Sequence, residues 1–364
     1  MKVSYYKLLL SLLGLTMLGA ITSSVYSQKY PEWAIGPFKR YEGNPIMKPQ
    51  GKFGTWESQN AYNPAVIVRD NRFLMLYRGE NSDTTLFKHY RSQIGFAESE
   101  DGIHWKRYPN NPVLKAEFDY ELPGGLEDPR LIELDGTYYV YYTAYCADKH
   151  SFWLCVATSA DMKHWTKHGP IWGDWDIKNI KNGAILTDPS NRPVKINGKY
   201  VLYCSGNDTA HICYSEDLIH WEIKDIENVI PKGFYPWEFC MAMTDYEPTK
   251  QNIILFLGSR HNGGNGEMTW NYALGQSLIK KDNPEKIVEI MEDPYMVPTD
   301  LRKGNLAAVI FNDAYMVPTE PYEQKGFIHY TLFCESLTLH DGEWYLYYGA
   351  ADHQIGLAKA PYKE

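Results

Sequence analysis

Three copies of a Ser-x-Asp-x-x-His-Trp motif bring together residue types that catalyse proton transfer in many enzymes. The copies occupy residues 99–105, 159–165 and 215–221, at steps of 60 and 56 residues. In isolation, the His and the Trp of one copy would look catalytic. Because the same set recurs in every unit, however, the repetition predicts a structural role instead. We expect the motif to cap a turn and its Trp to pack between repeated units, and we assign it no chemistry.

The elements around these motifs are short runs rich in Tyr, Val, Ile and Leu. Two such runs precede each copy: 72–77 and 94–97, 137–143 and 153–157, and 200–203 and 212–214. Two further units are formed by 253–258 with 272–279 and by 344–349 with 355–358. A period of this length, with several strands in each unit, is typical of a β-propeller. The sequence therefore predicts an all-β fold, a five-bladed β-propeller.

A polar residue followed by proline occurs before the strand pair of the first three units, at Asn63-Pro64, Asp128-Pro129 and Asp188-Pro189. We expect each to open the innermost strand of its blade and to point its polar side chain toward the central axis. Several blades converge at the axis of a propeller, so a substrate is expected to bind there. A second repeat, 293–300 against 313–320, indicates a local duplication that enlarges a loop.

Composition excludes several classes of protein. The chain has 364 residues, 44% of them hydrophobic and 22% charged, as in a folded globular protein rather than a disordered or collagen-like one. A net charge of −9 argues against a partner bound through its phosphates, so no nucleic acid is expected. Aromatic residues make up 15% and must pack a core, line a site, or both. No Cys/His cluster has metal-ligand spacing, and we predict no metal and no other cofactor.

The N-terminus has the pattern of a secretory signal peptide over residues 1–27. Lys2 and Lys7 precede an apolar run at 8–15, and small residues lead to a cleavage site after Ser27. The run is shorter than the roughly 20 apolar residues of a membrane anchor. We therefore expect a periplasmic or secreted protein with no membrane span, whose mature part, 28–364, is a single propeller domain.

Two cysteine pairs share a spacing of nine residues: Cys146 with Cys155, and Cys204 with Cys213. Each pair lies in two strand-like runs joined by a short polar turn, so cross-strand disulfides could form in an oxidising compartment. Buried thiols in the core of a sheet are the alternative. The spacing alone does not decide between them.

The segment Gly-Leu-Glu-Asp-Pro-Arg at 125–130, followed by the Tyr-rich run 138–144, resembles glycoside hydrolase family 130. Further matches lie at 60–65, 76–78, 94–99, 347–352 and 355–358, in the expected order over nearly all of the mature chain. That family comprises β-mannoside phosphorylases and β-mannosidases on a five-bladed propeller. The resemblance therefore implies an enzyme whose partner is a mannose-containing oligosaccharide.

Inverting cleavage of a glycosidic bond needs a proton donor and a carboxylate that activates water, with the two groups roughly 6.5–9.5 Å apart. Asp128, on a predicted inner strand beside Glu127 and Arg130, is the candidate acid, and the resemblance implies that it acts through a sugar hydroxyl. Alternatively, Asp128 only pairs with Arg130 and braces the blade. The resemblance places the base on a Glu of the fourth unit, which here is Glu238. Glu267 and Glu335 are the fallback carboxylates.

Hydrolysis and phosphorolysis differ in what attacks the sugar. A phosphorylase must hold phosphate with convergent Arg, Lys or His side chains. By the resemblance, an Arg in the third unit and a His in the fourth serve this purpose. Here the strands read Tyr-Cys-Ser at 203–205 and Phe-Leu-Gly-Ser at 256–259, although Arg260 and His261 follow. Export agrees with hydrolysis, because phosphorolysis conserves energy only where the sugar phosphate stays in the cell. The sequence predicts an inverting β-mannosidase, with a β-mannoside phosphorylase as the alternative.

By the resemblance, five residues bind the substrate: Asn63, Arg78, Arg130, Lys181 and Asp352. Each has a side chain that can form directional hydrogen bonds with sugar hydroxyls. For Arg78 the alternative is a structural ion pair with Glu80.

Other functions stay open. Tyr142, Trp237 and Trp270 could stack on a sugar, although aromatic side chains on strands are usually core. An arabinanase or xylosidase of the family 43 type would need an Asp base that opens the first blade, where this chain has Asn63. A non-catalytic glycan-binding propeller would keep the aromatics and lack an acid–base pair. Linkage specificity and oligomeric state are not predicted.

Overall fold

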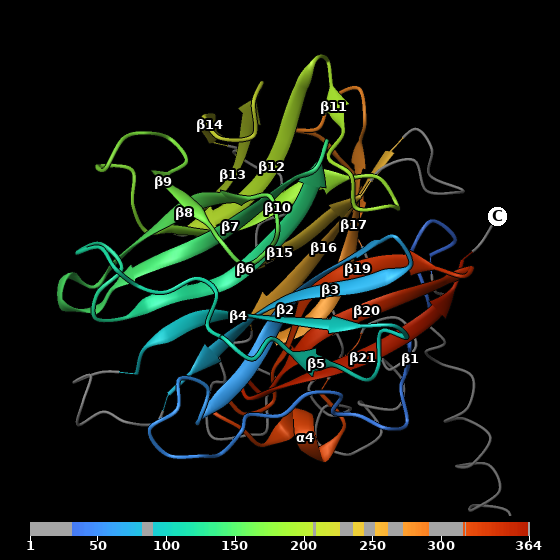
Figure 1. The fold of residues 1–364 in the computed structure, drawn as a ribbon. Helices are drawn as coiled ribbons and strands as arrows, with labels where there is room; N and C mark the ends of the chain where they lie inside the picture. Colours follow the sequence, from blue (N-terminus) through green and yellow to red (C-terminus); the bar gives the residue numbers. More distant parts are fainter. Residues whose placement is uncertain are drawn as a thin grey trace, which may run out of the picture.

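The computed structural model describes residues 31–81, 90–206, 209–225, 236–243, 252–260, 272–290, 316 and 318–362. Within these ranges the regular structure is almost entirely β-strand (Figure 1). The exceptions are a short 3-10 turn, η1 (Ala147–Lys149), and a one-turn helix, α4 (Pro321–Gln324). The predicted all-β class is confirmed. The predicted signal peptide and most of the repeat at 293–320 lie outside the described residues.

The strands follow one another in antiparallel meanders. The first contains β2 (Asn60–Arg69), β3 (Arg72–Glu80), β4 (Ser92–Ser99) and β5 (Lys106–Arg107). The second contains β6 (Gly125–Leu134), β7 (Thr137–Cys146), β8 (Ser151–Ser159) and β9 (Thr166–Pro170). The third contains β10 (Ile180–Thr187), β12 (Lys199–Gly206), β13 (Thr209–Ser215) and β14 (Trp221–Asp225), with β11 (Lys195–Ile196) paired to β12.

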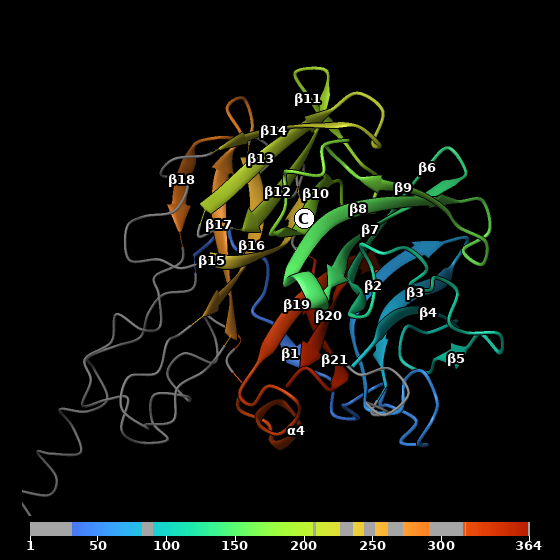
Figure 2. The same ribbon diagram turned by 90° about the vertical axis from the view of Figure 1, so that its left-hand side faces the viewer.

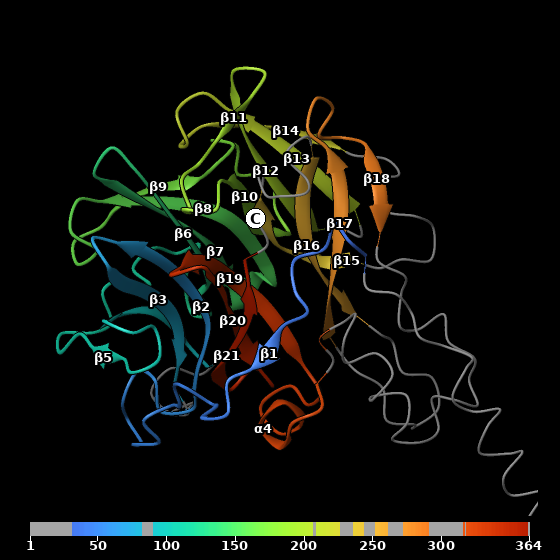
Figure 3. The same ribbon diagram turned by 90° about the vertical axis from the view of Figure 1, so that its right-hand side faces the viewer.

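The fourth meander contains β15 (Pro236–Met243), β16 (Asn252–Arg260), β17 (Tyr272–Lys280) and β18 (Ile287–Ile290). The fifth contains β19 (Leu332–His340), β20 (Glu343–Ala350) and β21 (Gln354–Pro361), and the N-terminal β1 (Lys39–Arg40) pairs with β21. Hydrogen bonding groups the described strands into three sheets, none of which closes on itself. Figures 2 and 3 show the meanders side by side around a common centre.

Strand β3 illustrates why these segments read as continuous apolar runs. Phe73, Met75 and Tyr77 pack toward the fifth meander, whereas Leu74 and Leu76 pack toward the second. Alternate side chains leave a strand on opposite faces, so β3 is buried on both. A strand covered on both faces has no polar face to alternate with its apolar one.

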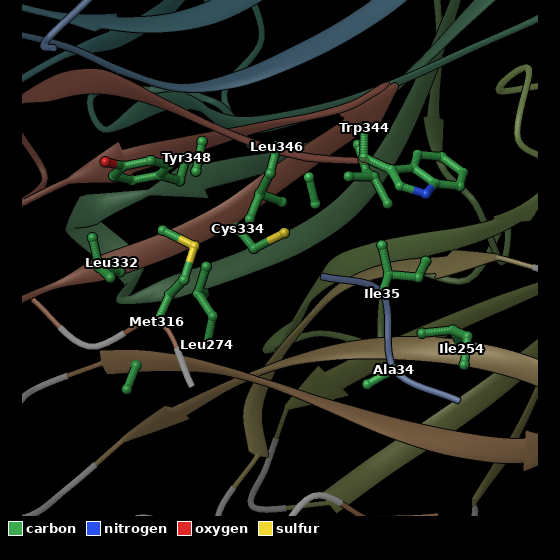
Figure 4. Packing of buried hydrophobic residues seen from close by; sticks show 14 of the residues in the cluster. Ala34, Ile35, Ile254, Leu274, Met316, Leu332, Cys334, Trp344, Leu346 and Tyr348 are labelled. Carbon is green, nitrogen blue, oxygen red and sulfur yellow. The ribbon is translucent and has the colours of Figure 1, made fainter. Parts of the chain in front are cut away.

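Five clusters of buried apolar side chains pack each meander against the next. Between the fifth and the first, Tyr347 and Phe73 belong to one such cluster. Between the fourth and the fifth, Ile254 and Leu274 share a cluster with Trp344 (Figure 4). The first strands of the meanders also contact one another in the order β2, β6, β10, β15, β19 and back to β2. The core is therefore distributed between neighbouring meanders.

Each of these first strands carries a register shift in its ladder with the second strand of its meander. At three of the shifts the extra residue has a positive φ: 47° at Asn63, 49° at Asp128 and 62° at Asn182. A bulge of this kind turns one side chain out of the regular alternation. Asn63 and Asp128 lie on the first strands of their meanders, as predicted, but neither opens its strand, because each is the fourth residue.

The corresponding prediction for Asp188 is wrong, because β10 ends at Thr187. Asp188 follows the strand, and its Oδ1 accepts hydrogen bonds from the backbone N–H groups of Ser190 and Arg192. The Asp-Pro dipeptide thus forms a tight turn. Asn182 occupies the bulge of this strand instead.

The repeated motif forms a turn, as predicted. Ser99 Oγ accepts from the backbone N–H of Gly102 over 2.9 Å, and Asp101 Oδ1 accepts from that of His104 over 2.8 Å. The other two copies make the same bonds. Trp105 packs edge-on against Tyr347, whose hydroxyl donates to the Gly102 carbonyl. The motif therefore joins the first meander to the fifth.

The described cysteines are thiols. Cys146 pairs with Ser151, and Cys155 pairs with Tyr142, so Cys146 and Cys155 lie at different levels of their hairpin and cannot form the disulfide considered from their spacing. Cys204 and Cys213 are diagonal neighbours with their sulfurs 3.7 Å apart.

Candidate active site

The side chains of Asn63 on β2 and Asp128 on β6 meet where the two strands bulge. Asn63 Nδ2 donates a hydrogen bond of 2.7 Å to Asp128 Oδ1. The same oxygen accepts a bond of 3.1 Å from a terminal nitrogen of Arg78 on β3. Asp128 is only 5% exposed, so the two donors surround a buried carboxyl group. The structure thus brings together three of the predicted site residues.

Arg78 also contacts two further carboxylates. Its other terminal nitrogen lies 2.9 Å from Glu127 Oε1 and 3.1 Å from Glu80 Oε2. Its Nε donates to Ser92 Oγ, and its guanidinium lies 4.8 Å from the centre of the Tyr62 ring. The structural pair of Arg78 with Glu80 therefore exists, but it is one contact among several.

A layer of polar side chains fixes Glu80 behind the guanidinium. Asn60 Nδ2 donates to one oxygen of Glu80, and the hydroxyls of Tyr62 and Ser92 donate to the other. Asn60 Oδ1 in turn lies 2.9 Å from Nδ1 of His353, in the turn between β20 and β21. Because these groups are connected, Arg78 is held in one orientation, and the first meander is tied to the fifth.

The two adjacent carboxyl groups have opposed pKa shifts. Burial acts to raise the pKa of Asp128, but the charges of Arg78 and Lys181 and the hydrogen bond from Asn63 outweigh it and lower this pKa. For Glu127, burial raises the pKa, and the attraction of Arg78 only partly offsets it. Neighbouring acids whose environments separate their pKa values are common in sites of acid–base catalysis.

Gly349 on β20 leaves room for the Asn63 side chain. A Cβ atom on Gly349 would lie 2.1 Å from Asn63 Oδ1, far inside contact distance. Asn63 can therefore reach Asp128 only because position 349 carries no side chain.

Arg130 forms a second buried ion pair, with Glu335 on β19. The guanidinium lies 2.5 Å from Glu335 Oε2 and donates to the carbonyls of Cys334 and Glu335. Both residues line a cavity of about 40 Å³ between β2, β6, β10 and β19. Arg130, which the sequence offered as a partner of Asp128, thus forms its ion pair with Glu335, while its charge also acts to lower the pKa of Asp128. The roles of Arg130 as a sugar ligand and of Glu335 as the fallback base stay predictions.

Lys181 and Asp352 are close enough to the cluster to act on it electrostatically. The charge of Lys181, on β10, helps to lower the pKa of Asp128 and acts against the rise that burial causes in the pKa of Glu127. Asp352 lies in the turn between β20 and β21 with a φ of 49°, and its charge acts on Tyr62. Their roles as sugar ligands stay predictions.

The predicted base, Glu238, lies on β15 opposite Gly258 of β16. Only the backbone of this part of β15 is described, so the role of Glu238 stays a prediction. The same holds for the side chain of Trp237, whereas Glu267, Trp270 and His261 lie outside the described residues.

Sequence reasoning missed part of the cluster. Glu127 enters the sequence prediction only as the neighbour of Asp128, although a pair of adjacent acids could have marked it as part of the site, and nothing in the sequence indicated Ser92. Tyr142, considered as a stacking platform, is fully buried and donates its hydroxyl to Glu121. It therefore belongs to the core.

Among the described residues, no group of three or more His, Cys, Asp or Glu could hold a metal ion. In the same part of the chain, no helix is long and apolar enough to cross a membrane.

Comparison with known proteins gives one family. The model of glycoside hydrolase family 130, described as beta-1,4-mannooligosaccharide phosphorylase, matches residues 37–317 and 312–364. A 1,2-beta-oligomannan phosphorylase of Thermoanaerobacter sp. (strain X514) is 29% identical over 324 residues, which is 88% of this chain and 96% of the relative. A beta-1,2-mannobiose phosphorylase of the same strain is 29% identical over 332 residues, covering 88% of this chain and 95% of its own length.

A solved structure with a TM-score of 0.74 is 30% identical and covers 92% of this chain and 98% of its own. It comes from work reporting that the GH130 family of mannoside phosphorylases contains glycoside hydrolases that target beta-1,2 mannosidic linkages in Candida mannan.

Proposed function

The chain belongs to glycoside hydrolase family 130, and from this membership we propose that it is an exported enzyme that hydrolyses β-mannosidic linkages in manno-oligosaccharides with inversion. The observation that carries the proposal is the buried Asp128 carboxyl, with Asn63 and Arg78 bonded to one of its oxygens. A buried acid between fixed donors can both bind a sugar hydroxyl and exchange a proton with it.

The fold we infer is a five-bladed propeller, with each meander as one blade and β1 completing the fifth. Its support is the cyclic packing of the meanders and the mutual contact of their first strands. In that arrangement the bulges at Asn63 and Asp128 face the axis, where blades converge on a substrate.

In the proposed mechanism Asp128 supplies the proton for the leaving group. The carboxyl protonates a sugar hydroxyl as that hydroxyl passes its own proton to the glycosidic oxygen. The bond from that oxygen to the anomeric carbon breaks while water attacks from the opposite face and gives its proton to Glu238. Arg78 and Asn63 stabilise the carboxylate that Asp128 becomes, because both already donate to the oxygen that gains charge.

Two observations favour hydrolysis, and the first of them also favours β-1,2 linkages. The solved structure at 30% identity comes from work on hydrolases that target beta-1,2 mannosidic linkages. In addition, the third-unit strand β12 ends in Cys204-Ser205-Gly206, without the Arg expected of a phosphorylase. A β-mannoside phosphorylase is the second candidate, because the two curated relatives described above are phosphorylases.

Export and processing complete the proposal. The signal-like pattern of residues 1–27 supports delivery to the periplasm or medium, with 28–364 as the mature domain. N-terminal sequencing of the protein recovered from those fractions should begin at Gln28, whereas recovery of the intact N-terminus from the cytoplasm would contradict export.

The central test is incubation of the purified protein with β-1,2-, β-1,3- and β-1,4-mannobiose, with and without inorganic phosphate. We expect release of α-mannose from the β-1,2 disaccharide, without dependence on phosphate, and loss of this activity in Asp128→Asn. Phosphate-dependent formation of mannose 1-phosphate would replace the hydrolase by the phosphorylase. Cleavage of arabinan alone, or binding of mannosides without turnover, would overturn the mannosidase assignment.

A further inference from the structure

Two exposed aromatic rings contact each other close to the candidate site. The centroids of Tyr90 and Phe327 are 5.6 Å apart, and the rings meet at 74°, edge to face. Tyr90 is 41% exposed and Phe327 is 47% exposed, whereas most large aromatic side chains of the described strands are buried. Two rings that meet at the surface next to a polar cluster can offer a ligand a flat apolar face.

Phe327 belongs to a segment that packs on the turn carrying Asp352. A Cβ atom on the preceding Gly326 would lie 2.2 Å from the carbonyl oxygen of Ala351, so the backbones are in direct contact. Ile328 N–H donates to that same carbonyl over 3.2 Å. Phe327 is thus fixed between two residues anchored next to Asp352.

Tyr90 approaches the same site from the first meander. It precedes β4 by two residues, and the first residue of that strand, Ser92, accepts a hydrogen bond from Arg78 and donates one to Glu80. The ring pair therefore spans the two chain segments that hold Arg78 and Asp352.

A mannose ring has hydroxyls around its edge and C–H groups on its faces. The polar cluster at Asp128 satisfies edge hydroxyls, whereas the rings offer flat apolar surface on which a sugar face can stack. We propose that Tyr90 and Phe327 form the stacking surface for the sugar unit that follows the mannose held at Asp128. This inference rests on the proposed function and names the part of the site that recognises the second sugar.

The chain offers a matched control in Phe118, which is also 47% exposed. Phe118 stacks on Tyr120 at 5.4 Å and 6°, and Lys167 lies over its ring at 5.2 Å. Tyr120 in turn contacts Trp175, which packs on Trp153 of β8, two strands out from β6. An equally exposed ring thus lies toward the outer part of the second meander.

The test compares binding of mannose and of β-1,2-mannobiose to the Asp128→Asn protein by titration calorimetry. Adding Phe327→Ala or Tyr90→Ala should raise the Kd of the disaccharide about fivefold to tenfold, equivalent to about 1.0–1.4 kcal/mol, and leave that of mannose within about twofold. Phe327→Leu, which keeps apolar volume without a flat face, should give an intermediate loss. Phe118→Ala should change neither affinity.

Unchanged affinity for the disaccharide in folded Phe327→Ala would overturn the inference alone. Equal losses for mannose and mannobiose, or an equal loss in Phe118→Ala, would also overturn it, because the effect would not be specific to the second sugar. If the Asp128→Asn protein binds no mannoside at all, the proposed substrate class fails and the inference fails with it.

Discussion

Replacing Gly349 by alanine should disable the candidate site without touching any of its polar groups. The new Cβ would lie 2.1 Å from Asn63 Oδ1 and 3.3 Å from Asn63 Cγ. Since a carbon and an oxygen need more than about 3 Å, the amide must move by about 1 Å. The 2.7 Å bond from Asn63 to Asp128 cannot survive that movement.

A hydrogen bond to a charged group contributes about 1.5–3 kcal/mol. If the bond positions Asp128 for proton transfer, its loss should lower kcat/KM roughly 10- to 150-fold. The assay is initial-rate hydrolysis of mannobiose at 25 °C, with urea unfolding as the check that the variant is folded.

A double-mutant cycle separates this mechanism from general damage. In an Asn63→Ala background the side chain that would clash is gone, so adding Gly349→Ala should cost little further activity. If Gly349→Ala lowers kcat/KM by the same factor in both backgrounds, or leaves the wild-type rate intact, then Gly349 does not act through Asn63.

Three further predictions concern stability and pH. Glu323→Ala should lower the free energy of unfolding in urea by about 3–5 kcal/mol, because it leaves the buried guanidinium of Arg40 without its bidentate partner; the exposed Glu343→Ala should change it by no more than about 0.5 kcal/mol. Asp101→Ala should leave mannosidase activity unchanged and cost about 1 kcal/mol at pH 7. Since the pKa of Asp101 is lowered in the folded protein, this difference should shrink as the pH falls below about 4, and a rate loss in Asp101→Ala would reinstate the repeated motif as a catalytic candidate. Finally, Arg78, Lys181 and Asn63 lower the pKa of Asp128 in the free protein, and burial by a bound sugar acts against them, so the fall in kcat toward high pH should occur at higher pH than the fall in kcat/KM; coincident limbs would argue against Asp128 as the acid.

The local sequence was sufficient for most of the fold. The predicted strand pair 72–77 and 94–97 corresponds to β3 and β4, although both strands are longer than predicted. These strands could be found because a strand that is buried on both faces has a continuous run of apolar residues. The prediction that Asp188-Pro189 opens a strand was wrong. An Asp side chain that accepts hydrogen bonds from the backbone N–H groups that follow it forms a turn instead. The cysteine spacing could not decide between a disulfide and two buried thiols at Cys146 and Cys155, because the register of a hairpin, not the number of intervening residues, decides which residues face each other; the thiols are what the structure has.

Long-range polar pairing could not be predicted. In three meanders a buried Glu before the first strand bonds to a Tyr of the second strand and to a cation on the outermost strand: Glu57 with Tyr77 and Arg107, Glu121 with Tyr142 and Lys167, and Glu323 with Tyr348 and Arg40. The cations are 50, 46 and 283 residues away from their partners. The third separation departs from the other two because the fifth meander takes its outermost strand from the N-terminus.

The candidate site lies where equivalent positions of the meanders carry different side chains. The first strands of the first, second and fifth meanders all bulge, but the residues at the shifts differ: Asn63, Asp128 and Glu335. The Ser-x-Asp-x-x-His-Trp turns, by contrast, are the same in three copies because each does the same structural work. A site that treats two sides of a sugar differently needs different groups at equivalent positions. At the bulges the backbone conformation is shared between meanders but the side chain differs. The bulges are therefore better candidates for catalysis than the Ser-x-Asp-x-x-His-Trp motif, which is the same in three copies.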